Sequence, residues 1–155
     1  MKLLHALASS IAGLVALWVY LSVGNPDFKL NPWIGFVAWA AFFAAGGTTD
    51  GAKKSIGAGI AGILLTAIAL YAVQVLGGGL VAMIGIVAVL AFVLVAMADI
   101  TFLAYTPAAF LGAASFFGSG GKVDESIAFV LLTWVVGVSF GFFSEAMGKR
   151  LATPV

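Results

Sequence analysis

The sequence predicts an all-α integral membrane protein: six transmembrane segments form a 3+3 inverted repeat, and prolines break the second and fifth segments. Three observations support this class. Of the 155 residues, 63% are hydrophobic and 8% are charged, against roughly 45–50% and about 25% in soluble chains. The charges cluster between long apolar stretches, and two of those stretches share a sequence pattern. We therefore expect a single membrane domain over residues 1–155, solvated by lipid.

The first half of the chain, residues 1–76, contains three predicted segments. The first, residues 3–23, continues about fifteen residues past Ala6-Leu7-Ala8, so we interpret it as a retained helix and not as a cleaved signal peptide. The second, residues 32–47, rises roughly 24 Å as a helix, which is short of a hydrocarbon core about 30 Å thick. It is therefore a short or discontinuous span. Residues 55–76 form the third segment.

The second half, residues 80–155, follows a flexible turn of three glycines at residues 77–79. Its first segment covers residues 80 to about 98. The next segment, residues 100–117, contains Pro107, which removes a backbone donor from any continuous helix. We expect this segment to be kinked or broken. The last segment runs from residue 127 to about 147.

The placement of basic residues distinguishes six crossings from five, the number expected if the fifth segment is a re-entrant half-helix. With six crossings and both termini in the cytoplasm, five basic residues are inside and two are outside. The inside residues are Lys2, Lys53, Lys54, Lys149 and Arg150, and the outside residues are Lys29 and Lys122. Five crossings place four inside and three outside. The positive-inside rule therefore favours six crossings.

The two halves match at an offset of 74 residues. FVAWAAFFAAGG at 36–47 and FLGAASFFGSGG at 110–121 are identical at six of twelve positions and share Phe-Phe-x-x-Gly-Gly. A proline precedes each copy, and a charged loop and a serine follow it. Because each half contains an odd number of segments, the second copy inserts in the opposite orientation. The alternative is a coincidence among 13 Phe and 20 Gly, with the prolines as ordinary helix-start residues.

Small residues four positions apart occur at roughly equivalent places in the two halves. The pairs are Gly57 with Ala61, and Gly137 with Gly141. Such pairs let helices approach closely in lipid. They fit a contact between the halves and a contact in a homo-oligomer equally well.

The sequence supplies little for catalysis. It has no Cys, which excludes disulfides and thiolate chemistry, and no zinc-protease, hydrolase or phosphate-loop motif. The single histidine, His5, lies beside Lys2 near the start of the first segment, where an interfacial side chain is expected. We therefore expect no enzyme, no cofactor and no metal site. The net charge of +1 gives no electrostatic footprint for nucleic acid.

Two acidic residues lie near predicted segment ends. Glu145 precedes Lys149 by four residues, a spacing that predicts an ion pair on a helix surface. Asp99 lies eight residues before Pro107, where it either caps the fifth helix or lies at a pore mouth. Because ion coupling usually needs charged groups within the bilayer, this placement favours an uncoupled pathway.

A pathway without buried charge is lined by small, hydroxyl and aromatic residues, and it suits a small neutral or weakly polar solute. The candidates lie in the two proline-led segments and the turn before the fifth. They are Asn31, Pro32, Trp33, Phe36, Trp39, Phe42, Asp99, Thr106, Pro107, Phe110, Ser115 and Phe116. We expect the two prolines to face each other across the repeat interface, with the four phenylalanines narrowing the path.

The alternative is that these aromatic rings only pack against neighbouring helices or lipid. Trp18, Tyr20 and Trp33 lie near segment ends, where they fit anchoring at the membrane interface.

The segments NPWIGFVAWAAFFAAGG and TPAAFLGAASFFGSGG resemble those of small bacterial inner-membrane proteins grouped as domain of unknown function 1097. The resemblance covers nearly the whole chain. It implies a location in a bacterial cytoplasmic membrane, and it brings no established substrate or site residue. A looser likeness to urea-channel-type proteins is one of architecture alone.

These observations predict a channel or facilitator for a small neutral or weakly polar solute. We expect a multi-pass protein of the inner membrane with both termini in the cytoplasm. Its expected partners are the lipid bilayer, a small solute and further copies of the chain in a homo-oligomer. The alternatives are an ion-coupled secondary transporter or exporter, and a structural membrane subunit that conducts nothing.

Overall fold

The computed structural model describes residues 1–153, and that range forms six α-helices and no strand. The helices are α1 (Leu3–Ser22), α2 (Pro32–Ala44), α3 (Thr48–Val75), α4 (Leu80–Ala96), α5 (Thr106–Gly118) and α6 (Ser126–Leu151). Short 3-10 turns occur at η1 (Pro26–Phe28), η2 (Met97–Asp99) and η3 (Thr101–Leu103). The predicted all-α class is confirmed.

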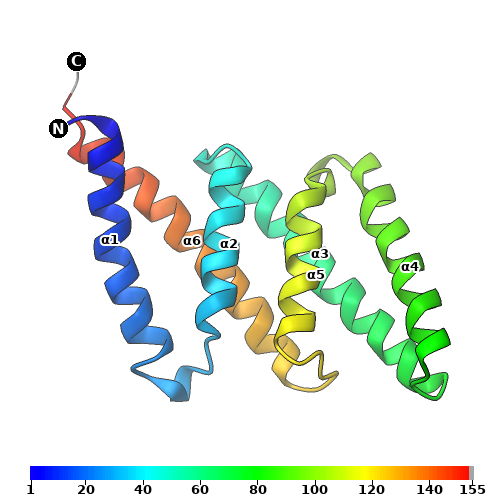
Figure 1. The fold of residues 1–155 in the computed structure, drawn as a ribbon. Helices are drawn as coiled ribbons and strands as arrows, with labels where there is room; N and C mark the ends of the chain where they lie inside the picture. Colours follow the sequence, from blue (N-terminus) through cyan, green and yellow to red (C-terminus); the bar gives the residue numbers. More distant parts are fainter. Residues whose placement is uncertain (154–155) are drawn as a thin grey trace.

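The helices lie in two layers (Figure 1). Helices α1, α2, α5 and α4 form one row in that order, and the long, tilted helices α3 and α6 lie behind it. Helix α6 packs against α1 and α2, while α3 packs against α5 and α4, and α3 and α6 also contact each other. Met1 and Thr153, the first and last described residues, lie together at one end of the molecule, which we call the termini end. The α1–α2 and α5–α6 connections lie at the opposite end.

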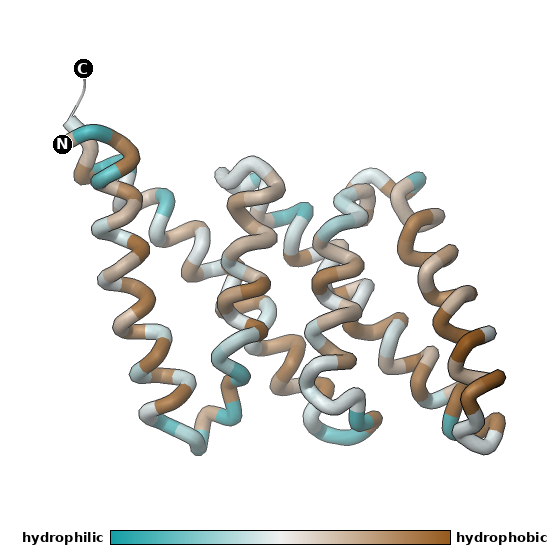
Figure 2. The backbone as a smooth tube through the Cα atoms, in the orientation of Figure 1, coloured by the Kyte–Doolittle hydropathy of each residue, from teal (hydrophilic) through white to brown (hydrophobic). Residues whose placement is uncertain are grey.

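Four helical stretches are long and apolar enough to cross a membrane. They are Leu3–Ser22, Thr48–Val75, Leu80–Asp99 and Ser126–Leu151. Hydrophobic residues occupy the middle of the molecule, and the hydrophilic positions gather toward its two ends (Figure 2). This distribution is the one expected for a helical protein that crosses a bilayer.

Helices α2 and α5 are the exceptions in length. Each has 13 residues, or about 20 Å at 1.5 Å per residue, shorter than the hydrocarbon core. They lie side by side in the middle of the front row and run in opposite directions (Figure 1). The prediction of a short second segment is confirmed.

The shared Phe-Phe-x-x-Gly-Gly pattern has a local structural cause, because it ends α2 and α5 in the same way. Gly46 and Gly47 have φ of 94° and 67°, and Gly120 and Gly121 have φ of 101° and 59°. In each copy the two glycine N–H groups donate backward to the carbonyls of the preceding Phe-Phe pair, at 3.0–3.1 Å. Glycine adopts this left-handed conformation without the Cβ clash that other residues meet.

The prolines begin helices instead of breaking them. Pro32 and Pro107 lie in the first turns of α2 and α5, where a missing N–H removes no helical hydrogen bond. The non-α-helical part of the predicted fifth segment lies before Pro107, at η3 and residues 104–105. The expected proline-broken helices are therefore corrected to two short, continuous helices with a proline at each start.

Helix α3 begins seven residues before the predicted start of the third segment. The residues expected to form a charged loop are helical from Thr48 onward. An ion pair of 2.6 Å between Lys54 and Asp50 spans one helical turn there. The i,i+4 spacing lets the two charges lie on the same helix surface, exposed to solvent.

Glycines let the helices of the two halves approach closely. Gly59 leaves no space for a Cβ because the Trp134 ring covers it, and Gly62 packs against the backbone of Ala109. Gly137 packs against the backbone of Gly35 in the same manner. The sequence left open whether the small residues contact the other half of the chain or another copy of it. The contact of Gly137 with Gly35 shows that at least one of these positions joins the two halves.

Trp18 has no interfacial role of the kind expected from its place near a segment end. Its ring is fully buried against Gly35, and its indole N–H donates to the Pro32 carbonyl at 3.0 Å. Tyr20 and Trp33 remain exposed, as anchoring side chains would be. Sequence position alone does not separate these cases, since all three aromatics lie near helix ends.

Candidate functional site

A polar pocket of about 300 Å³ opens at the end opposite the termini. It lies between the α1–α2 connection and the α5–α6 connection. Its walls are formed by Lys29, Asn31, Ser119, Lys122, Asp124, Glu125, Ser126, Phe129 and Val130. The two connections come from different halves of the chain, so this polar pocket adjoins the contact between the halves.

The charges around the polar pocket are balanced. Lys29 pairs with Glu125 at 3.6 Å, and its ammonium group lies 4.7 Å from the centre of the Phe129 ring. Asp124 accepts a hydrogen bond of 2.8 Å from the Ser126 N–H, and this bond holds the pKa of the Asp124 carboxyl below its ordinary value. Two cations and two anions line the pocket, so its field favours neither an anion nor a cation.

Two buried polar atoms lack hydrogen-bond partners within residues 1–153. They are Oδ1 of Asn31 and the hydroxyl of Ser115. Asn31 is held by its own N–H, which donates to the Thr133 hydroxyl at 3.2 Å. A buried polar atom without a partner costs about 1–3 kcal/mol, so these atoms favour any state in which a small molecule or water reaches them.

Ser115 is buried in α5, one helical turn before the wall of the polar pocket. Its neighbour Ser119, four residues on, lines the pocket. Gly118, the last residue of α5, lies against the Trp33 ring of α2. We call this contact between α2 and α5 the seam. Asn31 thus lines the polar pocket, and Ser115 lies one helical turn from its wall residue Ser119.

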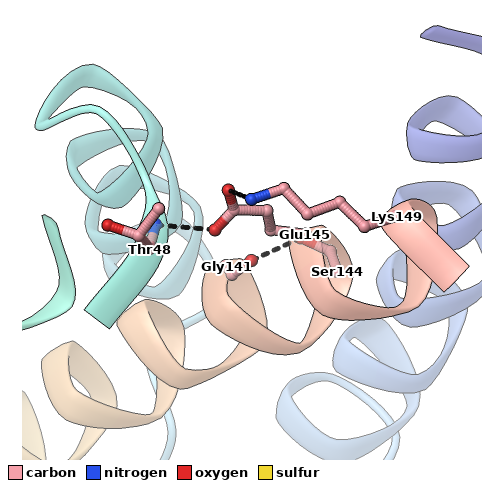
Figure 3. Close-up of polar contacts among 5 residues, drawn as sticks. All are labelled: Thr48, Gly141, Ser144, Glu145 and Lys149. Carbon is pink, nitrogen blue, oxygen red and sulfur yellow. Dashed lines mark hydrogen bonds and ion pairs between the residues drawn. The ribbon is translucent and has the colours of Figure 1, made fainter. Parts of the chain in front are cut away.

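At the termini end of the molecule, a clamp formed by Glu145 joins the two halves (Figure 3). Glu145 of α6 accepts a hydrogen bond of 2.6 Å from the Thr48 N–H at the start of α3, and Lys149 donates to the same carboxylate at 2.6 Å. Thr48 has φ of 60°. A Cβ on Gly47 would lie 2.9 Å from Glu145 Oε1, so glycine at this turn admits the carboxylate.

The structure brings some of the predicted site residues together and separates others. Asn31 lines the polar pocket, Trp33 lies at the seam, and Ser115 is buried in α5. Pro32 and Pro107 begin antiparallel helices and lie at opposite ends of the molecule (Figure 1). The prediction that they face each other is therefore wrong, because α2 and α5 run in opposite directions and their first turns lie at opposite ends.

The four predicted phenylalanines fall into two different environments. Phe42 and Phe116 are fully buried, whereas Phe36 and Phe110 are exposed. Phe42 packs against Gly141 and lies 6.4 Å, between ring centres, from Phe142. Each pair has the same environment in the two halves, and neither pair lines the polar pocket.

The remaining predicted residues lie away from the polar pocket. Trp39 is buried and donates through its indole N–H to the Ser144 hydroxyl at 3.1 Å. Asp99 is exposed in η2, and the first turn of α5 has no side-chain cap. Thr106 is the first residue of α5 and is half-buried. Asp99 therefore does not cap the fifth helix.

Sequence reasoning missed most of the polar pocket. Lys29 and Lys122 were predicted on the same side of the membrane, which is a signal that their two loops lie at one end. No feature of the sequence indicated that Lys29 pairs with Glu125 across 96 positions. The pairing depends on the contact of α2 with α5 and α6, which only the folded chain brings about.

The fold and these sites define a class: a multi-helix membrane protein with closely packed halves and a polar pocket at one end. The chain matches the family model described as "Protein of unknown function (DUF1097)" over residues 8–149, so it belongs to that family. The predicted resemblance is therefore confirmed. No curated protein and no solved structure has significant similarity to the chain.

Proposed function

We propose that this protein is a membrane facilitator for a small neutral or weakly polar solute, which passes along the seam between α2 and α5. One observation carries the proposal: two buried polar atoms lack partners among residues 1–153, one on Asn31 in the wall of the polar pocket just before α2 and one on Ser115 within α5. A solute with N–H or O–H groups supplies the hydrogen-bond partners that these atoms lack. The free-energy cost of their desolvation then falls while the solute is bound.

The balanced charge of the polar pocket supports a neutral solute. Lys29 and Glu125 are paired with each other, and Asp124 is engaged with the backbone of Ser126. A monovalent ion entering this pocket meets no excess of opposite charge. We therefore propose passive transport of an uncharged molecule, and not catalysis, as the role of this site.

We infer that the two halves form a 3+3 inverted repeat around the seam. Equivalent glycines support this, since Gly47 meets Glu145 at one end and Gly121 meets Leu70 at the other. The contact of Gly62 with Ala109 has its counterpart in that of Gly137 with Gly35. In each pair of contacts, the residues of one contact become those of the other when their numbers are shifted by 74 or 75. A pseudo-twofold axis in the membrane plane requires this kind of exchange.

The distribution of basic residues supports an orientation in the membrane. Lys2, Lys53, Lys54, Lys149 and Arg150 belong to the termini end, and Lys29 and Lys122 to the opposite end. By the positive-inside rule, we propose that the termini end faces the cytoplasm of a bacterial inner membrane. The polar pocket then opens on the outer side, and the Glu145 clamp closes the inner side.

Flux into liposomes tests the proposal. The purified chain in proteoliposomes should accelerate the entry of at least one of urea, short amides and glycerol, measured by stopped-flow light scattering without any ion gradient. Ser115→Ala removes an unpartnered hydroxyl and should lower that flux several-fold while the protein remains folded. Ser22→Ala is the matched control, because Ser22 is also buried but its hydroxyl donates to the Trp18 carbonyl within α1.

Two results would replace this function by another. If no solute of the panel enters faster than into empty liposomes, facilitation of this class is excluded. If entry requires a proton or sodium gradient, the protein is a coupled transporter.

A further inference from the structure

A second groove, separate from the polar pocket, lies between α3 and α6 at the termini end. It has a volume of about 290 Å³. The first turns of α3 and the second half of α6 form its walls, with the residues Thr49, Ala52, Lys53, Ile56, Val138, Ser139, Phe142 and Phe143. We call it the lipid groove.

The lipid groove is amphipathic along its length. Its apolar walls include Ile56, Val138 and Phe142. Thr49 and Lys53 lie in the first two turns of α3, next to the membrane surface predicted by the charged residues at this end. A groove of this form has a polar mouth at the level of lipid headgroups and an apolar floor at the level of acyl chains.

The charge at the mouth of the lipid groove is not neutralised within the protein. Lys53 has no ion-pair partner among residues 1–153, whereas its neighbour Lys54 pairs with Asp50 at 2.6 Å. Lys149, on the same end of α6, is engaged with Glu145. Lys53 is exposed and therefore available to an anionic group from the membrane.

We propose that the lipid groove binds an anionic phospholipid, with one acyl chain against the apolar walls and the phosphate at the Lys53 ammonium group. An apolar groove within the bilayer is more favourably filled by hydrocarbon than by water. Basic sites between transmembrane helices on the cytoplasmic side bind anionic headgroups through charge-assisted hydrogen bonds. This site is independent of the solute pathway and of any function assigned to it.

The chemistry favours a lipid with net negative charge. A zwitterionic phospholipid brings the same acyl chain and phosphate, but its headgroup cation offsets the attraction to Lys53. We therefore expect phosphatidylglycerol to bind more tightly than phosphatidylcholine of identical chain length.

Native mass spectrometry of the full chain in detergent micelles, titrated with each of these two lipids, tests the proposal. Lys53→Gln should weaken phosphatidylglycerol binding about fivefold and leave phosphatidylcholine binding unchanged. Lys54→Gln removes the same charge one residue away and is the matched control, with binding close to that of the unchanged chain. Equal affinity for the two lipids, or equal losses in the two variants, would overturn the proposal.

A second variant tests the apolar part of the groove. Ser139→Trp places a large ring inside it and should displace the bound lipid while the melting temperature stays within a few degrees of that of the unchanged chain. Lipid binding that is unaffected by this ring contradicts the assignment. A change in oligomeric state without a change in bound lipid would identify the groove as a contact between copies of the chain, and would also overturn the proposal.

Discussion

Glu145 joins parts of the chain that are 97 residues apart. Its carboxylate accepts from the Thr48 N–H at the start of α3 and from Lys149 on its own helix (Figure 3). The anionic group lies at a helix N-terminus, where the helix dipole favours negative charge. The left-handed conformation of Thr48 is unfavourable for a residue with a Cβ, so we infer that this contact helps to hold the turn.

Removing the Glu145 side chain should therefore destabilise the protein. Glu145→Ala loses both hydrogen bonds of a largely buried carboxylate, and we expect the free energy of unfolding to fall by about 1–3 kcal/mol. Glu145→Gln keeps an acceptor for Thr48 and should lose less. Chemical unfolding in detergent micelles measures both values.

The control for this prediction is Lys149→Gln. More than half of the Lys149 side chain is exposed, at 55%, so its ion pair contributes at most about 1 kcal/mol. A Glu145→Ala variant as stable as the unchanged chain would show that the clamp has no energetic role.

Contacts of single residues were predictable from the sequence only where both partners lie on one helix. The i,i+4 spacing predicted the Glu145–Lys149 pair, which is confirmed, because both partners lie on one helix. The Thr48 contact and the indole bond from Trp134 to the Ser55 carbonyl depend on helices packed across the two halves. Spacing along the chain carries no information about such partners.

At the scale of elements, the helices were predicted better than their ends. The glycine turn at 77–79 and the short second segment are confirmed, since glycine runs and apolar length are local properties. The start of α3 was placed too late, because the charged residues before Ser55 were interpreted as a loop. Pro32 and Pro107 were expected to break their helices, but each lies in the first turn of a continuous helix.

Close helix packing gives an element-scale prediction for Gly62 and Gly85. A Cβ at Gly62 would overlap with the backbone of Ala109, while a Cβ at Gly85 in α4 would have no neighbouring atom within 4 Å. Gly62→Ala should destabilise the protein by about 1–3 kcal/mol through overpacking. Gly85→Ala should be neutral or stabilise it by up to about 1 kcal/mol, because alanine favours the helix.

Thermal unfolding of both variants in the same detergent compares these effects. Equal melting temperatures for Gly62→Ala and Gly85→Ala would contradict the close approach of α3 and α5.

At the scale of the whole molecule, Met1 and Thr153 lie at one end, and the two connections that line the polar pocket lie at the other (Figure 1). The chain has no native cysteine, so single cysteines report the membrane side directly. We expect cysteines at positions 2, 50 and 152 to react with an impermeant maleimide only from the cytoplasmic side. A cysteine at position 122 should react only from the outside.

Labelling of intact cells and of inverted membrane vesicles distinguishes the two sides. Opposite accessibility of positions 2 and 152 would exclude an even number of crossings and, with it, the inverted repeat of three segments per half.

The candidate site was predicted in part. Asn31, Trp33 and Ser115 were selected because they lie in the two proline-led segments; Asn31 lines the polar pocket, Trp33 lies at the seam and Ser115 is buried in α5. The charged residues of the polar pocket were not selected, because a loop residue gains its partners only when two connections meet at one end of the fold. The four phenylalanines were assigned to a pathway, and the buried pair instead packs inside the protein.

The central claim is that solute passes along the seam between α2 and α5, and a reversible lock on that seam tests it most directly. Trp33→Cys and Gly118→Cys place two thiols on facing positions of the two helices, since the Trp33 ring contacts Gly118. A short, reducible bis-methanethiosulfonate reagent then joins α2 to α5 in proteoliposomes. We predict that the cross-link abolishes solute flux and that a reductant restores it, whereas undiminished flux through fully cross-linked protein would contradict the account.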